Sequence, residues 1–357
     1  MTNKNGNCEP CLMKGNEALA EAAFRAGMQA YFGYPITPQS EVLEYLTEHV
    51  PQHPGVVVLQ SESELAAINM VYGAAGAGAR VMISSSGPGI SLMQEGLSYM
   101  TSAQLPALIV NVQRGGPGLG TIQPSQGDYF QAVKGGGHGD YHLIVLAPAS
   151  VQETVDFVFE GFRLTEKYRN PVMILTDGAL GQMMEKVTLP PEGSLLKTDA
   201  PWATTGKKHS RERNIITSLF IQPERMEKLN LVLQEKYRQM QKEVRWEEIQ
   251  TKDADIVLVA FGLTSRICEK TLELAREKGS KVGLLRPITL YPFPTEAIAK
   301  LSNRVKAFLT VEMNAGQMVE DVRLAVDGKC PVHFYGRMGG MIPSPEEVLS
   351  QLMSIAK

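Results

Sequence analysis

The sequence predicts an α/β protein, in which a domain with a parallel sheet is followed by a smaller α/β domain. Short apolar runs alternate with segments of helical periodicity from residue 12 to residue 185. Most of these runs are apolar on both faces, as strands of a helix-covered parallel sheet are. The alternation resumes at residue 254, and 357 residues exceed what a single core usually supports.

The first elements follow from periodicity. Apolar residues at helical spacing predict a helix over 16–29, and a short strand follows at 30–34. A second helix is expected at about 39–49, and the β-branched run 55–60 predicts a strand. The helix expected at 64–79 is rich in small residues, which suits close packing. The other strands expected in this half are 80–86, 106–113, 143–148 and 171–178.

Residues 186–250 break the pattern, because they begin with irregular polar sequence. The charged stretch 222–248 then predicts one helix of about 40 Å, with Pro223 in its first turn. Its apolar residues are sparse, so we expect it to bridge domains or pack on a partner. The elements expected beyond it are strands at 254–261, 281–286, 305–312 and 330–336, and helices around 264–278, 294–302, 314–325 and 345–356.

These elements predict four parts. They are a flexible tail over 1–11, a first domain over 12–190, a linker with the long helix over 191–250, and a second domain over 251–357.

Composition excludes several classes of protein. A net charge of -3 gives no electrostatic reason to expect nucleic acid or an anionic membrane as a partner. No apolar run approaches the roughly 18 residues of a membrane span, and the polar N-terminus is not a signal peptide. Four cysteines in 357 residues form no disulfide framework, so we expect a cytoplasmic protein. Cys8 and Cys11 could form a redox pair, but we interpret them as incidental residues of the tail.

The stretch Tyr34–Pro38, with sequence YPITP, ends the strand at 30–34. Each proline fixes its own φ and disfavours helical backbone at the residue before it. The Thr37 hydroxyl therefore stands on stiff backbone, which suits either ligand binding or a simple change of chain direction.

Glu64 begins the small-residue helix. The spacing Ser61-x-x-Glu64 fits a capping box, which would explain the glutamate structurally. The alternative is a functional carboxylate at the edge of the parallel sheet where ligands bind. On spacing alone, the capping box is favoured.

Arg114 follows a buried strand and precedes two glycines. An arginine at this sheet edge can bind a carboxylate or phosphate with two hydrogen bonds, or it can be a solvated loop residue. Thr37, Glu64 and Arg114 each follow a different strand of one sheet, so we expect them to converge.

Two glycine-rich loops do not fit nucleotide motifs. The stretch 84–92 has Gly87 and Gly89 but Leu92 at the position of the third glycine, and the stretch 134–140 lacks the order of a phosphate loop.

The motifs together resemble the α subunit of the 2-oxoacid:ferredoxin oxidoreductases, and the resemblance is greatest to the branch that acts on 2-oxoisovalerate (3-methyl-2-oxobutanoate). It covers nearly the whole chain. The segments that carry it are GNEALAEAAFRAG (15–27), YPITPQSE (34–41), QSESELAAINMVYGAAGAGAR (60–80), SSSGPGISLMQEG (84–96), NVQRGGPGLGTIQPSQGD (111–128) and LLRPITLYPFP (284–294).

The resemblance implies a pyrimidine-type domain that binds thiamine diphosphate, followed by a domain like the C-terminal domain of transketolases. Glu64 matches the glutamate that contacts the aminopyrimidine ring and shares a proton with its N1′, and Pro35 and Ile36 would also contact the cofactor. Arg114 would hold the substrate carboxylate, and Thr37 would hydrogen-bond the reacting end of the substrate. The implied reaction oxidises and decarboxylates a 2-oxoacid to acyl-CoA, with coenzyme A as co-substrate and ferredoxin as electron acceptor.

The chain lacks two features of the complete enzyme. No G-D-G followed by Asn-Asn is present, and the TDG at 176–178 has no such continuation. We therefore expect a β subunit to hold the diphosphate and Mg²⁺, and expect no metal ligands in this chain. Without a cluster motif, the iron–sulfur clusters would belong to partner subunits, a γ and a cluster-bearing δ subunit. The chain alone is predicted to be inactive.

Two alternatives stay open. The chain could be a non-catalytic structural homologue, although an intact Thr37, Glu64 and Arg114 argues against that. It could also act on 2-oxoglutarate or an aryl-pyruvate, although a dicarboxylate would need another cation beyond Arg114.

Overall fold

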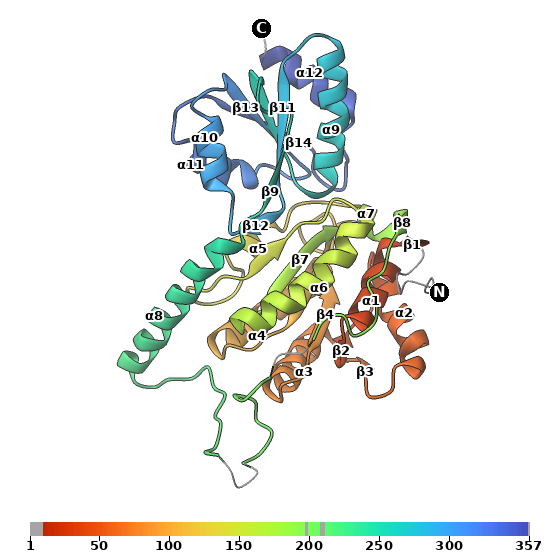
Figure 1. The fold of residues 1–357 in the computed structure, drawn as a ribbon, viewed down its shortest axis with the longest axis vertical. Coiled ribbons are helices and arrows are strands. Elements are labelled where there is room, and N and C mark those ends of the chain that lie inside the picture. Colours follow the sequence, from red (N-terminus) through yellow and green to blue (C-terminus); the bar gives the residue numbers. More distant parts are fainter. Residues whose placement is uncertain (1–9, 197–198, 208–210, 356–357) are drawn as a thin grey trace.

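The computed structural model describes residues 10–196, 199–207 and 211–355. The described residues form two large sheets, one above the other in Figure 1, each with helices packed on it, and a small sheet of two strands. Each helix in the described ranges is either too short or too polar to span a lipid bilayer.

The first sheet has seven strands in the order β12-β6-β7-β5-β4-β2-β3, all parallel except β12. The strands β4 to β7 are buried along their whole length, as the apolar runs predict. The bounds are β2 (Ala30–Gly33), β3 (Val57–Gln60), β4 (Val81–Ser85), β5 (Leu108–Gln113), β6 (Ile144–Leu146), β7 (Val172–Asp177) and β12 (Thr289–Tyr291).

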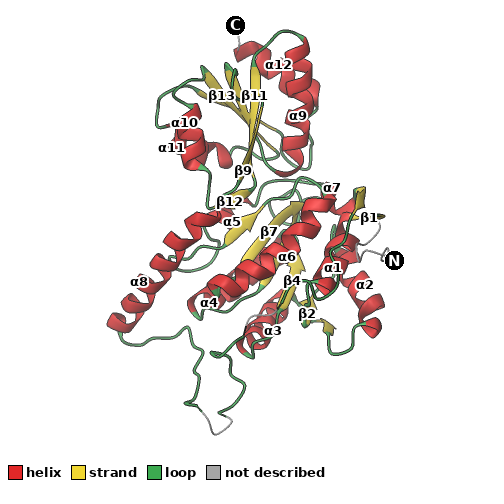
Figure 2. Cartoon of the chain, in the orientation of Figure 1, coloured by secondary structure: helices red, strands yellow, loops and turns green. Residues whose placement is uncertain are grey.

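Helices cover both faces of this sheet (Figure 2). On one face α1 packs against α6 and α2, and α7 lies beside α1; on the other face α3 packs against α4, while α5 lies beside β6. The bounds are α1 (Gly15–Arg25), α2 (Ser40–His49), α3 (Glu64–Gly76), α4 (Pro88–Ser102), α5 (Tyr129–Val133), α6 (Val151–Tyr168) and α7 (Gly178–Gln182).

The predicted flexible tail is wrong at its last residue. Cys11 begins β1 (Cys11–Lys14), which pairs antiparallel with β8 (Met184–Val187), so Cys11 lies opposite Val187. Backbone hydrogen bonds to a distant segment order this end of the chain, and local composition cannot reveal them. Cys8 lies outside the described residues.

The predicted helix over 222–248 is wrong in its last third. The helix α8 spans Pro223–Met240 and begins with proline as expected, and a short 3₁₀ segment follows. Residues Trp246–Ile249 then form β9, which pairs antiparallel with β11 (Val282–Pro287). The free edge of β11 satisfies the backbone of this charged segment, and that pairing outweighs its helical composition.

The second sheet has five strands in the order β14-β13-β10-β11-β9, all parallel except β9. The helices α9 and α12 pack against each other, as do α10 and α11. The remaining bounds are β10 (Ile256–Val259), β13 (Ala307–Glu312), β14 (Val332–Gly336), α9 (Gly262–Glu277), α10 (Thr295–Leu301), α11 (Met318–Val326) and α12 (Pro345–Ile355).

Strand β12 and a buried glutamine join the two sheets. Although β12 lies within the predicted second domain, it pairs with β6 of the first sheet, so a division at residue 251 does not separate the two hydrogen-bonded sheets. The Gln126 side chain donates to the Phe261 carbonyl (2.8 Å) and accepts from the Met313 N–H (3.0 Å). These buried bonds fix the second domain against the carboxyl-end loops of the first.

Candidate functional site

Polar side chains gather at the carboxyl edge of the first sheet. Thr37 follows β2, Glu64 follows β3 as the first residue of α3, and Arg114 follows β5. Parallel strands end at one edge, and ligands bind there in open α/β sheets. The contacts below connect these three predicted residues.

Glu64 is buried and does not belong to the predicted capping box. The cap of α3 is Ser63, whose hydroxyl accepts from the Ala66 N–H (3.3 Å). Ser61 instead donates to the carbonyl of Gly33 (3.1 Å) at the end of β2. Because Ser61 bonds to the end of β2, it does not cap the helix, and the capping-box interpretation is wrong. Glu64 therefore does not have that structural role.

The carboxylate of Glu64 points toward the start of α4. Its Oε1 accepts a hydrogen bond from Ser85 Oγ (3.1 Å), and the residue is 5% exposed. A Cβ atom on Gly89 would overlap both Glu64 Oε1 and Ser85 Oγ. Only glycine therefore allows the backbone of α4 to pass directly beside this carboxylate.

Gly87 brings the same segment beside Arg114. It has a φ of 45°, and a Cβ atom on it would lie 3.2 Å from Arg114 Nε. The segment Gly87–Gly89 thus lies between Glu64 and Arg114. In the sequence these glycines belonged to a nucleotide motif that did not fit and to a segment that carries the family resemblance; neither predicted their close approach to Glu64 and Arg114.

Arg114 is half-buried, and its guanidinium is hydrogen-bonded to two backbone carbonyls. Its Nη1 donates to the carbonyl oxygen of Thr37 (2.9 Å), and its Nη2 donates to that of Leu119 (2.9 Å). Its Nε is buried without a partner in the structure. Two carbonyls therefore hold the guanidinium, which keeps further N–H groups for an anion.

The C-terminal end of the YPITP stretch is held by hydrogen bonds from neighbouring helices. The carbonyl oxygen of Pro38 accepts from Asn16 Nδ2 (2.8 Å) and Gln182 Nε2 (3.3 Å). Both amides also donate to the carboxylate of Glu41, at 3.0 and 2.7 Å. Because α1, α2 and α7 thus fix one end of the stretch, the exposed Thr37 stands on a constrained backbone.

Four buried polar atoms at this edge have no hydrogen-bond partner among the described residues. They are Gln39 Nε2, Ser86 Oγ, Asn111 Oδ1 and Arg114 Nε. Gln39 and Ser86 are fully buried. Buried polar atoms are usually paired, so such a group at one sheet edge fits a site that a polar ligand completes. Neither the sequence motifs nor their spacing pointed to Gln39 or Asn111.

Asp177, at the end of β7, is a buried carboxyl beside this site. Its Oδ1 accepts from the N–H groups of Ala179 (2.9 Å) and Leu180 (3.2 Å), which caps α7. Burial raises the pKa of Asp177 to about 6, although these two bonds lower it. The carboxyl therefore favours its protonated form more in the folded than in the unfolded chain.

We expect Asp177 to make the protein less stable as pH rises from about 4 through 6. Below about 4 both states are protonated; above about 6 the folded state must carry a buried charge, at a cost of about 3 kcal/mol. Chemical denaturation of wild type and Asp177→Asn at pH 5 and pH 8 measures the free energy of unfolding of each protein at both pH values. The variant should lose less stability than wild type between the two pH values, and an equal loss would contradict the assignment.

The part of the chain that the structure describes has a cavity of substantial volume but no cluster of metal-binding side chains. In the described ranges, no three His, Cys, Asp or Glu side chains form a group that could bind a metal ion. A cavity of about 550 Å³ lies between the end of α4, residues 138–141 and α8. None of Thr37, Glu64 and Arg114 lines it, so it is separate from the sheet-edge site.

Comparisons with known proteins cover both domains. A family model described as pyruvate flavodoxin/ferredoxin oxidoreductase, thiamine diphosphate-binding, matches residues 21–252. A model described as pyruvate:ferredoxin oxidoreductase core domain II matches residues 254–348.

Similar sequences carry related names. The ketoisovalerate oxidoreductase subunit VorB of Methanothermobacter thermautotrophicus is 50% identical over 97% of each chain. The 2-oxoglutarate synthase subunit KorA of Methanothermobacter marburgensis is 35% identical over 97% of this chain and 99% of its own.

Solved structures share the fold. A 2-oxoglutarate:ferredoxin oxidoreductase from Magnetococcus marinus, with 2-oxoglutarate, coenzyme A and succinyl-CoA bound, is 28% identical with a TM-score of 0.85. The match covers 98% of this chain and 65% of that one. A split-gene transketolase is 13% identical with a TM-score of 0.59, over 96% of this chain and 97% of its own, and this likeness concerns the fold alone.

Proposed function

This chain belongs to the pyruvate flavodoxin/ferredoxin oxidoreductase family, and from that premise we propose that it is a subunit of a 2-oxoacid:ferredoxin oxidoreductase for branched-chain 2-oxoacids. The reaction is CoA-dependent oxidative decarboxylation of 2-oxoisovalerate to acyl-CoA and CO2. The observation that carries the choice of substrate is the greater identity to the ketoisovalerate subunit than to the 2-oxoglutarate subunit. The alternative substrate for the same reaction is 2-oxoglutarate.

The sheet edge fits the pyrimidine half of thiamine diphosphate. The buried carboxylate of Glu64 would share a proton with a ring nitrogen of the aminopyrimidine, and Ser85 would keep that carboxylate in place. The exposed Pro35 and half-buried Ile36 offer apolar surface to the rings. When bound, the cofactor supplies the nucleophilic carbon and the electron sink for decarboxylation, while these residues bind and orient it.

Thr37 and Arg114 would bind the 2-oxoacid. The guanidinium of Arg114 bonds to the Thr37 carbonyl, so a substrate carboxylate on its remaining N–H groups would lie beside the Thr37 hydroxyl. That hydroxyl would donate to the keto oxygen, where negative charge develops. The branched aliphatic end of the substrate needs no second cation, and the motifs at this sheet edge supply one cation, Arg114.

The relatives are named as subunits, so the chain acts with partner chains. We propose a β subunit that holds the diphosphate and Mg²⁺, since the chain lacks the G-D-G…N-N motif. Iron–sulfur clusters would lie on further subunits, γ and δ, and pass electrons to ferredoxin. The cofactor would then lie between this chain and the β subunit.

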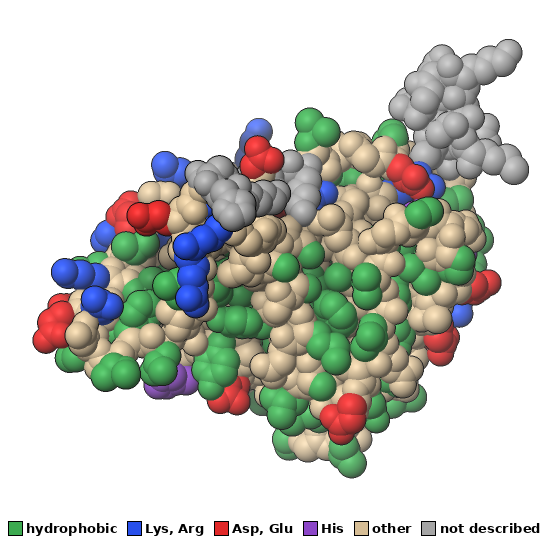
Figure 3. Space-filling view, turned by 90° about the horizontal axis from the view of Figure 1, so that it is seen from below, with side chains coloured by type: hydrophobic (Ala, Val, Ile, Leu, Met, Phe, Trp, Pro, Cys, Tyr) green, Lys and Arg blue, Asp and Glu red, His purple; other side chains and the backbone are tan. Residues whose placement is uncertain are grey.

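Helix α3 offers the surface for the β subunit. After Glu64 it has no charged residue, and Leu65 (46% exposed) and Met70 (38%) lie on its uncovered side. Apart from Asn69, the exposed side of α3 is apolar, and an apolar helix face is normally buried. Viewed from below, where α3 lies in Figure 1, the molecule exposes many hydrophobic side chains and keeps most charges at the margins (Figure 3). A partner on this side would also close the Glu64 site.

We expect Met70→Asp to weaken binding of the β subunit at least tenfold, because the interface would then bury an unpaired charge. Co-purification and analytical ultracentrifugation of the complex measure this. The control is Leu324→Asp, an exposed apolar residue of α11 (74%) that should leave assembly unchanged. Normal assembly of Met70→Asp would place the interface elsewhere.

The proposed substrate is tested with the complete complex under anaerobic conditions. Purified complex is assayed for CoA-dependent viologen reduction with 2-oxoisovalerate, 2-oxoglutarate, pyruvate and an aryl-pyruvate. We expect kcat/KM to be highest for 2-oxoisovalerate. A higher kcat/KM for 2-oxoglutarate would favour the alternative, and no turnover with any 2-oxoacid by a cofactor-loaded complex would support a non-catalytic homologue.

A further inference from the structure

The loop that follows Arg114 is closed on itself. Arg114 forms an isolated antiparallel bridge with Pro124, and the Gly115 N–H donates to the Gln123 carbonyl (2.9 Å). Across the loop, the Thr121 N–H donates to the Gly115 carbonyl (2.7 Å). Arg114 therefore lies where the two ends of the loop 115–124 meet. The Leu119 carbonyl of that loop accepts a hydrogen bond from the Arg114 guanidinium.

A turn of the second domain, which contains Gly339 and Gly340, packs against this loop. Gly340 has a φ of +89°, and a Cβ atom on it would overlap Gln123 Cβ and lie 3.0 Å from Thr121 Cγ2. From the other side, a Cβ atom on Gly115 would lie 2.9 Å from the backbone nitrogen of Gly340. The two backbones thus meet with no room for a methyl group between them.

The turn is itself fixed to α12 at both ends. Arg337, just before the turn, forms an ion pair with Glu347. Ser344, just after it, donates its N–H to Glu347 Oε2 (2.8 Å) and accepts from the Glu347 N–H (3.2 Å), which is a capping box. Glu347 therefore holds residues 337–344 as one closed unit against the Arg114 loop.

We infer that the turn formed by residues 337–344 of the second domain positions Arg114 for the substrate carboxylate, with Gly340 and Gly115 as positioning residues. The inference rests on the proposed function of Arg114. The turn contacts the loop at Thr121 and Gln123. The same loop carries the Leu119 carbonyl, which accepts a hydrogen bond from the Arg114 guanidinium and orients it. A small displacement of the loop would misalign the guanidinium and weaken substrate binding.

Two neighbouring glycines of the turn provide a matched test. Gly339 also has a positive φ (+65°), but a Cβ atom on it would meet nothing within 4 Å. Gly339→Ala and Gly340→Ala therefore both strain the backbone, but only the new Cβ atom at residue 340 collides with Gln123. In the complete complex, Gly340→Ala should raise the KM for 2-oxoisovalerate about tenfold, with kcat and the KM for CoA within about twofold of wild type. Gly339→Ala should keep all three within about twofold.

Removing the obstructing Cβ should reverse the effect. Gln123→Gly combined with Gly340→Ala is expected to restore the KM for 2-oxoisovalerate to within about threefold of wild type. A merely structural defect would instead reduce active enzyme and kcat and leave KM unchanged. Equal KM values for Gly339→Ala and Gly340→Ala, in a complex whose wild type is active, would overturn the inference.

A second pair of variants serves if Gly340→Ala does not fold. Glu347→Gln loosens both ends of the turn without adding atoms, and the exposed neighbour Glu346→Gln is its control. We expect about a threefold rise in the KM for 2-oxoisovalerate for Glu347→Gln alone, and equal KM values for the two would overturn the inference. A wild-type complex inactive on every 2-oxoacid would instead contradict the proposed function.

Discussion

Replacing Glu64 by Gln is expected to lower kcat of the complete complex about 10³-fold, with the KM for the 2-oxoacid within about twofold. The amide can still accept the hydrogen bond from Ser85, but it cannot share a proton with the aminopyrimidine. The measurement is anaerobic, CoA-dependent viologen reduction at saturating cofactor.

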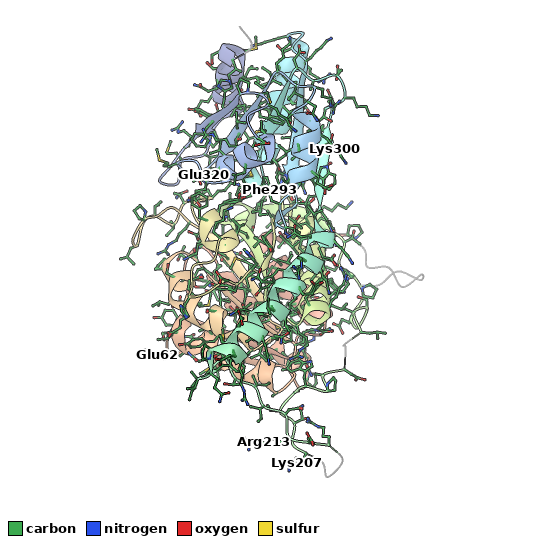
Figure 4. All side chains as sticks on the ribbon, turned by 90° about the vertical axis from the view of Figure 1, so that its left-hand side faces the viewer. Glu62, Lys207, Arg213, Phe293, Lys300 and Glu320 are labelled. Atoms are coloured by element: carbon green, nitrogen blue, oxygen red, sulfur yellow. The ribbon has the colours of Figure 1, made fainter. Side chains whose placement is uncertain are left out.

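Glu62→Gln is the control for this prediction. Glu62 is exposed two residues before α3 and extends away from the body of the domain (Figure 4), so its loss should change kcat less than twofold. Equal kcat values for wild type and Glu64→Gln, with the cofactor bound in both, would exclude the proton role.

Replacing Arg114 by Ala is expected to raise the KM for 2-oxoisovalerate about 10²-fold or more. The substrate carboxylate loses its charged partner, and the carbonyls of Thr37 and Leu119 lose their donor. Arg114→Lys keeps the charge but not the planar fork, so it should recover only part of the loss. Initial rates against 2-oxoacid concentration measure both.

Arg213→Ala is the matched control. Arg213 is exposed in the linker, at the end of the molecule remote from the second domain (Figure 4), and its loss should leave KM unchanged. If Arg114→Ala had the same KM as Arg213→Ala, the substrate carboxylate would be bound by another group.

Periodicity predicted the central elements of both domains because their burial is nearly complete. The strands β4, β5 and β7 are buried at every position, and a run that is apolar on both faces has no other stable place in an α/β domain. The sequence could not predict β1, β8, β9 and β12, which are stabilised by pairing with distant segments. Strand β9 is the clearest case: its WEEI sequence is charged, and only the free edge of β11 makes it a strand.

The candidate site was predicted in part. The rule that ligands bind where parallel strands end predicted that Thr37, Glu64 and Arg114 converge, while their roles were implied by the family resemblance alone. Ser85 and the approach of Gly89 to Glu64 depend on how α4 crosses the sheet, which no local pattern encodes. The spacing favoured Ser61 as the cap of α3, but the structure uses Ser63, because Ser61 donates its hydroxyl to the end of β2.

The role of Glu64 is measured by the exchange of the thiazolium C2 proton for deuterium in thiamine diphosphate bound to the complete complex. Quenched-flow NMR of the released cofactor gives the rate for wild type, Glu64→Gln and Glu62→Gln. We expect exchange in Glu64→Gln to be at least about 10²-fold slower than in the other two. Equal rates in all three would show that Glu64 of this chain does not activate the cofactor.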